Sequence, residues 1–322
     1  MKFRKVLEVP RTESIVRAGE GAGLAMDSYG EADADRSIVV VGGAFLTAAL
    51  YRPFAQAFVT ALESEDDGHS WAVHVYDRRG HGQSPEQGPG YGMDTEISDL
   101  ESVLRETGAR HVLGHSLGGA VVLNAARHSG SALGVSRLSV YDPAVNIDGS
   151  TPVDWLPAFS QAVNDGDVPR ALARMRRGML PGTALSRAPE PVLALLFGAL
   201  GRTKANTVFA DLMPSSVGEL KAALEEEAHA EDFAGIAQEC CIFYGARSPE
   251  YFRQTARRLH EAVPGPLRQV PRCVHGSVPA VGKRLVTALA EFHVHGPQEE
   301  EPGGHRGRQR KSSRRGASEA TA

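Results

Sequence analysis

The segment Gly114 to Gly119 (GHSLGG) holds the residues best suited to covalent chemistry. It follows a short apolar run, Ala109 to Leu113, and precedes residues with helical spacing, Ala120 to Ala125. This order predicts a strand, a sharp turn and a helix, with Ser116 at the apex of the turn. A strained turn of this kind exposes the serine hydroxyl to substrate, and the flanking glycines let strand and helix approach closely. The segment therefore predicts a nucleophilic serine.

Strands are also predicted on both sides of this segment. The strongest is Ser37 to Val41, a β-branched run that ends at Gly42 and Gly43 and is typical of a strand buried on both faces of a parallel sheet. The other predicted strands are Val6 to Pro10, Leu24 to Tyr29, Trp71 to Tyr76, Leu138 to Tyr141, Glu239 to Tyr244 and Leu267 to Val270. Helical spacing alternates with most of them, so an α/β fold is expected, with a mostly parallel central sheet and helices on both faces. The carboxyl ends of its strands meet at one edge, where sites form.

The strand pattern stops near Val145 and resumes near Asp232. The segments between them have helical spacing, with Ser215 or Ser216 as the predicted cap of the last: Trp155 to Asn164, Val168 to Met179, Pro191 to Gly201 and Val217 to Ala230. We interpret residues 1–145 and 233–295 as one α/β core, and residues 146–232 as a helical cap inserted after the sixth strand. Residues 296–322 are charged, lack large apolar side chains and are expected to form a disordered tail. The alternative is a tether to nucleic acid or an anionic surface.

Composition narrows the possible functions. The net charge of −4 gives the molecule no basic bias towards nucleic acid. No apolar segment is long enough to span a bilayer, and the basic N-terminus lacks the apolar stretch of a signal peptide. Cys240 and Cys241 are expected on opposite faces of one strand, and Cys273 is alone, which indicates neither a disulfide framework nor a metal site. We expect a cytoplasmic protein without metal or other cofactor, and the oligomeric state is left open.

Four features in the right order resemble the α/β-hydrolase family over about Ser37 to Phe292. They are Gly42-Gly43 after the third strand, Tyr76 to Ser84 (YDRRGHGQS) after the fourth, the Ser116 turn after the fifth, and a histidine after the last strand. The chain is most similar to a bacterial subgroup of small hydrolases with a Gly-Gly-Ala loop and a Tyr-Asp-Arg-Arg-Gly motif. This resemblance implies the α/β-hydrolase fold and a serine mechanism.

The resemblance also implies a base for the serine. His275 follows the last strand, on the side of the sheet where Ser116 is expected, and would take the serine proton. His81 and His115 lie inside motifs and are expected to hold loops. Four more histidines are expected at the surface or at helix ends, namely His111, His260, His293 and His295.

The acid partner of His275 departs from the commonest family pattern. Most members place it after the seventh strand, where this chain has Ser248, which carries no charge. Some members place it after the sixth strand, where this chain has Asp142 before Pro143. We therefore predict Asp142 as the group that orients His275 and stabilises its charged form. The alternatives are a turn-capping role for Asp142, Glu250 as a substitute acid, and a serine–histidine pair without an acid.

Two backbone N–H groups are needed to bind the oxyanion, and by resemblance they belong to Ala44 and Leu117. The turn Asp77 to Gly82 (DRRGHG) is expected to brace the loop beside Ser116 through hydrogen bonds and ion pairs. The cap is expected to shape an apolar pocket. Candidates for its lining are Trp155, Leu156, Phe159, Leu195, Leu196, Phe197, Phe209 and Met213.

Together these features predict a serine hydrolase that acts on a carboxylic ester, lactone or thioester of a small hydrophobic molecule through an acyl-serine. The same residues could serve a cofactor-free cyclase, lyase or haloperoxidase. The uncharged Ser248 also leaves open a hydrolase homologue that binds a small ligand without turnover. We expect a small-molecule partner, and neither nucleic acid nor a membrane.

Overall fold

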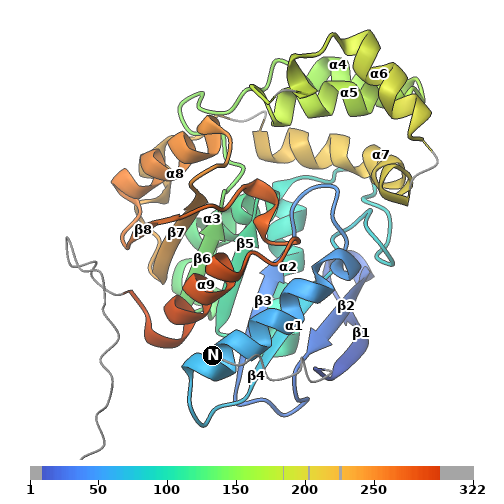
Figure 1. Cartoon of the computed structure of the whole chain (residues 1–322). Coiled ribbons are helices and arrows are strands. Elements are labelled where there is room, and N and C mark those ends of the chain that lie inside the picture. Colours follow the sequence, from blue (N-terminus) through green and yellow to red (C-terminus); the bar gives the residue numbers. More distant parts are fainter. Residues whose placement is uncertain (1–8, 184, 202–203, 225–226, 298–322) are drawn as a thin grey trace, which may run out of the picture.

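A computed structural model describes residues 9–183, 185–201, 204–224 and 227–297. These residues form one 8-stranded sheet of order β1-β2-β4-β3-β5-β6-β7-β8 (Figure 1). Its strands are β1 (Arg11–Arg17), β2 (Gly23–Tyr29), β3 (Arg36–Val41), β4 (Trp71–Tyr76), β5 (His111–His115), β6 (Arg137–Tyr141), β7 (Glu239–Gly245) and β8 (Leu267–Val270). The pairs β1–β2 and β2–β4 are antiparallel, and every other pair is parallel. The predicted mostly parallel sheet is confirmed.

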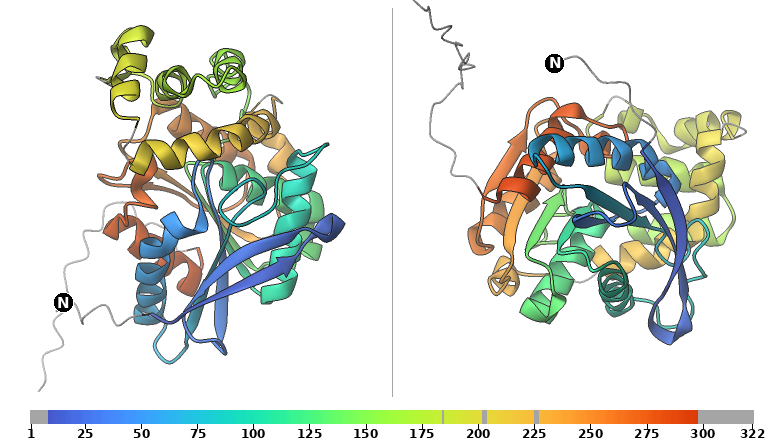
Figure 2. Two further views of the ribbon diagram at one scale, coloured as in Figure 1. Left: turned by 90° about the vertical axis from the view of Figure 1, so that its right-hand side faces the viewer. Right: turned by 90° about the horizontal axis from the view of Figure 1, so that it is seen from below.

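Helices cover both faces of this sheet (Figure 2). α1 (Ala48–Glu65) and α9 (Lys283–His295) pack on one face and share its apolar cluster. α2 (Met93–Thr107), α3 (Leu117–Ser129) and α8 (Glu250–Ala262) pack on the other face. Because side chains along a buried parallel strand alternate between the two faces, the central strands contribute side chains to both apolar clusters.

The N-terminal strand differs from the expectation. The strand predicted at Val6 to Pro10 falls mostly on residues 1–8, which lie outside the described residues, and positions 9 and 10 are not part of a strand. β1 begins at Arg11 and buries only Val16 among its seven residues. A polar edge strand leaves no apolar alternation in the sequence, which explains why it was missed.

The described residues of the predicted cap, residues 146–232, lie over the carboxyl edge of the sheet. Its helices α4 (Leu156–Asn164), α5 (Val168–Met179) and α6 (Glu190–Ala199) form the outer layer, and α7 (Lys204–Leu224) lies between that layer and the core (Figures 1 and 2). The predicted cap of a helix at Ser215 or Ser216 is wrong, because both serines lie within α7. Their hydroxyls donate to the Leu212 carbonyl one turn earlier.

The two ends of the cap meet in a narrow neck. Ile147 and Ala228 form an isolated parallel bridge. The Asp148 N–H donates to the Ala228 carbonyl at 2.9 Å, and the Ala228 N–H donates to the Asn146 carbonyl at 2.9 Å. The cap is therefore joined to the core through a short ladder beside α8.

Two buried histidines were expected elsewhere. His111 and His293 were predicted at the surface or at helix ends, yet both are buried and their Nδ1 atoms lie 3.2 Å apart. That prediction is wrong because α9 packs across the start of β5. Cys240 and Cys241 fall into the two different apolar clusters, as predicted. The expected disordered tail lies outside the described residues except for positions 296 and 297.

Candidate active site

Ser116 occupies a strained turn between β5 and α3. Its backbone has φ 55° and ψ −119°, a conformation that is rare for a residue with a side chain. The turn closes only because its neighbours are glycines. A Cβ on Gly118 would lie 2.1 Å from the Val41 carbonyl oxygen, and one on Gly114 would lie 2.5 Å from the Gly118 carbonyl oxygen. The packing thus holds the Ser116 hydroxyl at the carboxyl edge of the sheet.

Three side chains from distant parts of the sequence form one hydrogen-bonded chain at this edge. His275 Nε2 lies 3.1 Å from Ser116 Oγ, and His275 Nδ1 lies 3.2 Å from Asp142 Oδ2. The His275 ring stacks on Phe252 of α8, with ring centroids 4.1 Å apart and an interplanar angle of 12°. The stacking restricts rotation of the imidazole, so that one nitrogen faces the serine and the other faces the carboxylate.

Asp142 is fully buried and is held by hydrogen bonds on both oxygens. It directly follows β6 and has a positive φ of 45°. Its Oδ1 accepts from the Gly245 N–H at 3.1 Å, and its Oδ2 accepts from the Ser248 hydroxyl at 2.5 Å. Ser248, at the position that carries the acid in most of the family, thus positions the displaced carboxylate. Glu250, the other acid considered, forms ion pairs with Arg253 and Arg257 instead.

The two amides expected to bind an oxyanion lie beside Ser116. Ala44 follows β3, and Leu117 is the first residue of α3. Both residues line the cavity next to the Ser116 side chain. In the part of the chain that the structure describes, neither N–H donates to a protein acceptor. Phe45, the next residue after Ala44, is buried at φ 60°, which marks this loop as a second strained turn.

The predicted bracing role of the DRRGHG turn is confirmed. Asp77 Oδ1 accepts from the Ala48 N–H at 2.6 Å, and its Oδ2 accepts from the Gln83 N–H at 3.1 Å. The Arg79 guanidinium binds both oxygens of Asp99 on α2, at 2.8 and 2.9 Å. Such bidentate, charge-assisted bonds fix the turn between α1 and α2.

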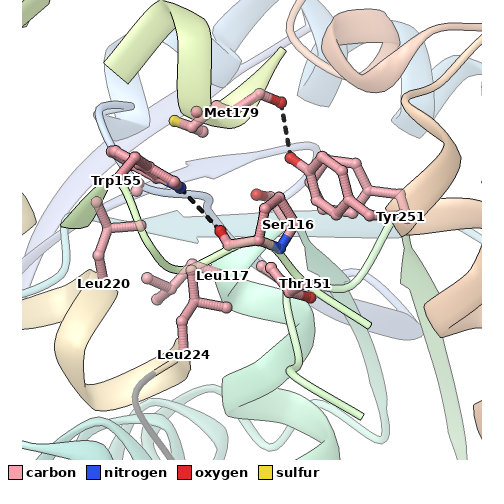
Figure 3. A pocket seen from close by; sticks show the side chains of 13 residues that line it. Ser116, Leu117, Thr151, Trp155, Met179, Leu220, Leu224 and Tyr251 are labelled. Carbon is pink, nitrogen blue, oxygen red and sulfur yellow. Dashed lines mark hydrogen bonds between the residues drawn. The ribbon is translucent and has the colours of Figure 1, made fainter. Parts of the chain in front are cut away.

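A small apolar cavity lies above Ser116, between the core and the cap (Figure 3). Its volume of about 20 Å³ holds roughly one water molecule. Trp155 closes it from the cap side, where the indole N–H donates to the Pro152 carbonyl at 2.8 Å. A Cβ on Gly178 of α5 would lie 2.2 Å from the indole ring, so the ring packs directly on the helix backbone. On the core side, the Tyr251 hydroxyl donates to the Met179 carbonyl at 2.8 Å.

Only one of the predicted pocket residues, Trp155, lines this cavity. Leu195 and Leu196 are exposed on α6, and Leu156, Phe159 and Met213 are buried in the apolar cluster that the cap shares with the sheet. The lining residues that the sequence analysis missed include Thr151, Met179, Leu220, Leu224, Tyr251 and Phe252. Apolar spacing in α7 and α8 identified buried faces but could not show which side chains would turn towards Ser116.

Among the described residues, no group of three or more His, Cys, Asp or Glu side chains is arranged to hold a metal ion. Within the same residues, every helix is too short or too polar to cross a bilayer.

The fold and the hydrogen-bonded serine agree with the sequence family. The sequence model of the Alpha/beta hydrolase family matches residues 38–307. The chain therefore belongs to the Alpha/beta hydrolase family.

Two curated relatives match shorter segments. A non-heme haloperoxidase of Rhodococcus erythropolis is 33% identical over 101 residues, which are 29% of this chain and 37% of that protein. A non-heme chloroperoxidase of Streptomyces lividans is 37% identical over 93 residues, 28% of this chain and 33% of that protein. Each match spans only about a third of the relative's length.

Solved structures match over most of the chain. An α/β hydrolase from Sphaerobacter thermophilus has a TM-score of 0.66 and 23% identity, and covers 87% of this chain and 100% of its own. The enol-lactonase from Burkholderia xenovorans has a TM-score of 0.64 and 19% identity, with the same coverage of 87% and 100%. An esterase from Exiguobacterium antarcticum has a TM-score of 0.63 and 18% identity, over 87% of this chain and 99% of its own. At these identities the likeness shows the fold.

Proposed function

We propose that this chain is a serine hydrolase that cleaves a carboxylic ester, lactone or thioester of a small hydrophobic molecule. The observation that carries this proposal is the hydrogen-bonded chain from Ser116 Oγ through His275 to Asp142. An esterase and an enol-lactonase share the fold, which is consistent with acyl chemistry at this site. Sequence family and geometry thus support the same reaction class.

In the proposed mechanism, His275 Nε2 accepts the Ser116 proton while the serine oxygen attacks the carbonyl carbon. The buried Asp142 carboxylate holds the imidazole in the required tautomer and stabilises its charged form. The N–H groups of Ala44 and Leu117 bind the negative charge that develops on the carbonyl oxygen. His275 then returns the proton to the leaving group, and a water molecule releases the acyl group by the same steps in reverse. These steps need no cofactor.

The cavity indicates the kind of substrate. Its lining is mostly aliphatic and aromatic, including Leu220 and Leu224 from α7 and Trp155 from the cap loop (Figure 3). An apolar lining stabilises an apolar acyl or alcohol group. Because the space beside Ser116 holds only about one water molecule in this conformation, we expect the cap to move when a substrate binds.

Labelling with a fluorophosphonate probe tests the proposal, because only an activated serine reacts rapidly. We expect wild type and Ser131→Ala, a change at an exposed serine, to label and to hydrolyse p-nitrophenyl esters at the same rate. Ser116→Ala should abolish labelling and lower ester turnover by at least about 10³-fold. Full turnover by Ser116→Ala would refute the serine mechanism. An unlabelled, inactive wild type would favour the ligand-binding alternative.

A haloperoxidase-type reaction is a second candidate, because both curated relatives carry that name. On this site hydrogen peroxide would replace water as the attacker of the acyl-serine, and the peracid released would oxidise a halide ion. The same three residues would serve both reactions. Halogenation of a dye in acetate buffer with peroxide and bromide, absent in Ser116→Ala, would support this second activity.

A further inference from the structure

A cluster of buried charges joins the cap to the core next to the active site. Arg78, Glu96 and Glu219 are each at most 2% exposed. The Arg78 guanidinium donates to Glu96 at 2.6 Å and lies 3.0 Å from Glu219, which belongs to the cap helix α7. His81 Nε2 binds the other Glu219 oxygen, and His81 Nδ1 binds the Leu46 carbonyl at 2.8 Å.

The charges in this cluster are maintained despite their burial. Burial disfavours the charged form of Arg78, but Glu219 and Glu96 outweigh it and raise the arginine pKa well above its ordinary value. Burial likewise opposes ionisation of Glu219, but Arg78 and the His81 hydrogen bond hold its pKa below the ordinary value. In a buried ion pair, the cost of removing both charges from water largely cancels their attraction, so such pairs contribute little to stability. The position of this cluster suggests a role beyond stability.

Arg78 also fixes the direction of an oxyanion amide. Its guanidinium donates to the Gly43 carbonyl at 3.2 Å. That carbonyl and the Ala44 N–H belong to one planar trans peptide, in which the C=O and N–H bonds point in opposite directions. By holding the carbonyl on one side, Arg78 directs the Ala44 N–H to the other side, where Ala44 lines the cavity beside Ser116.

A second series of hydrogen bonds holds the N–H of Gly43 in the same loop and ends at the backbone of His275, the proposed base. The Gly43 N–H donates to the Tyr51 hydroxyl at 2.8 Å, and that hydroxyl lies 2.7 Å from His115 Nδ1. His115 Nε2 lies 3.1 Å from the His275 carbonyl oxygen. Because that oxygen only accepts, Nε2 carries the proton and Nδ1 accepts from Tyr51. Burial, with a contribution from His275, lowers the pKa of His115 to about 3, so the ring is neutral at working pH.

We propose that Arg78 and Tyr51 are positioning residues that hold the two peptides on either side of Gly43, Arg78 through the Gly43 carbonyl and Tyr51 through the Gly43 N–H, and so keep the Ala44 N–H in its oxyanion-binding orientation. Glu219 makes this orientation depend on the closed position of α7. The inference rests on the proposed serine mechanism. Opening the cap removes the Glu219 carboxylate from Arg78 Nη2, the same atom that donates to the Gly43 carbonyl. Glu96 then holds the guanidinium only at Nη1, and Nη2 can turn away from that carbonyl. The oxyanion site is complete only when the cap has closed over a substrate.

The decisive variant is Glu219→Gln, which keeps the side-chain shape and removes the charge. The same turn offers a matched control, Asp99→Asn, which alters the buried Arg79–Asp99 pair but leaves Gly43 untouched. We expect Glu219→Gln to lower kcat for a p-nitrophenyl ester by about 10- to 100-fold, with KM within about threefold. Affinity for an alkyl boronic acid, which mimics the tetrahedral intermediate, should fall by the same factor as kcat/KM. Asp99→Asn should lower the melting temperature with kcat unchanged.

Tyr51→Phe tests the second series of hydrogen bonds without touching a charge. It removes the acceptor of the Gly43 N–H and should reduce kcat and boronic-acid affinity together, by about 10-fold. It also serves if Glu219→Gln does not fold. Wild-type kcat and boronic-acid affinity in either folded variant would overturn the positioning role.

Coupling to the cap is reciprocal, which gives an independent measurement. Boronic-acid binding should slow hydrogen exchange of the α7 amides in wild type, and this protection should be lost in Glu219→Gln. Equal protection in both proteins would overturn the dependence on α7. Failure of the serine mechanism would look different, because wild-type protein itself would then show neither ester turnover nor labelling of Ser116.

Discussion

The helix that follows Ser116 and the outermost helix of the cap have similar lengths but very different packing. α3 buries nine of its 13 residues, whereas α6 buries only Leu193 among its ten. The other large side chains of α6 include Val192, Leu195 and Leu196, which are 56%, 76% and 40% exposed. Since apolar burial is the main stabilising contribution to packing, α3 is tightly held and α6 is not.

The cap is joined to the core through apolar packing, for example of Phe159 against Phe45, and through polar contacts. The neck is a backbone ladder around Ile147 and Ala228. α7 contributes Met213, Leu220 and Leu224 to the apolar cluster of the core. It also contacts the core through the Glu219 ion pair and through the Gln87 side chain, which donates to the Ser215 carbonyl at 2.8 Å. The core therefore fixes the positions of the reacting groups, while the outer layer of the cap, in which α6 buries only Leu193, is displaced at a lower cost in free energy.

The largest expected effect lies in the rigid region. Asp142→Asn keeps the shape of the side chain but presents an amide to His275, which no longer favours the Nδ1–H tautomer. We expect kcat to fall by about 10³- to 10⁴-fold, measured with a p-nitrophenyl ester. Ser248→Ala removes only one donor to Asp142 and should cost about tenfold. Equal losses in the two variants would contradict the assignment of Asp142 as the acid.

A matched pair of glycine substitutions compares the two regions directly. Gly118→Ala places a Cβ 2.1 Å from the Val41 carbonyl oxygen, whereas Gly178→Ala places one 2.2 Å from the Trp155 ring. Backbone in the sheet cannot move aside, so Gly118→Ala should lose about 3 kcal/mol or more of unfolding free energy. Trp155 belongs to the displaceable cap, and Gly178→Ala should lose about 1 kcal/mol. Urea unfolding followed by circular dichroism measures both, and similar losses would contradict the proposed difference.

The difference between core and cap also decides which features of the site could be predicted from the sequence. Ser116 and Asp142 were predicted because each follows a buried strand with a strong apolar signal, and His275 because it follows the last strand in the order of the family. The carboxyl ends of parallel strands lie at one edge of the sheet. The role of Ser248 was missed because it depends on a hydrogen bond to a residue 106 positions away. The wrong placement of His111 and His293 has the same cause, since they meet across 182 positions. In the cap, packing between α5, α7 and the Trp155 loop decides which side chains face the cavity, and no local pattern encodes it.

Low pH should destabilise the core. Burial lowers the pKa of His111 to about 4 and that of His115 to about 3, and holds the His293 pKa well below the ordinary 6.5. As the pH falls from 6.5 towards 4, these rings take up protons in the unfolded chain but remain neutral in the fold. Unfolding free energy should therefore decrease over this range, by up to about 4 kcal/mol per pH unit for the three groups. Urea unfolding at pH 7.5, 6.0 and 5.0 measures the slope, and a flat profile would contradict it.

The stability of the neck of the cap should change with pH in the opposite direction to that of the core. His229 pairs with Asp148 at 2.7 Å, and this hydrogen bond raises the histidine pKa above its ordinary value of 6.5. The extra stabilisation from this charged pair is therefore fully present below pH 6.5 and is lost as the pH rises through the folded-state pKa. Limited proteolysis within the cap should accelerate between pH 6 and 8 in wild type, and should show less change in His229→Gln.

The smallest expected effect is on substrate choice. Trp155→Ala removes the indole that closes the cavity, and because this ring contacts the cap rather than the sheet, the serine and its partners keep their positions. We expect turnover of an acetyl ester to stay within about twofold of the wild-type value. The ratio of kcat/KM for a hexanoyl ester to kcat/KM for the acetyl ester should rise about tenfold, which corresponds to about 1.4 kcal/mol of differential binding. Leu195→Ala, at an exposed position of α6, is the control and should leave both values unchanged. If Trp155→Ala lowered acetyl and hexanoyl turnover equally, the indole would instead support the reacting groups. The cap would then help to position the active site, and the proposed division between a fixed core and a displaceable cap would be wrong at Trp155.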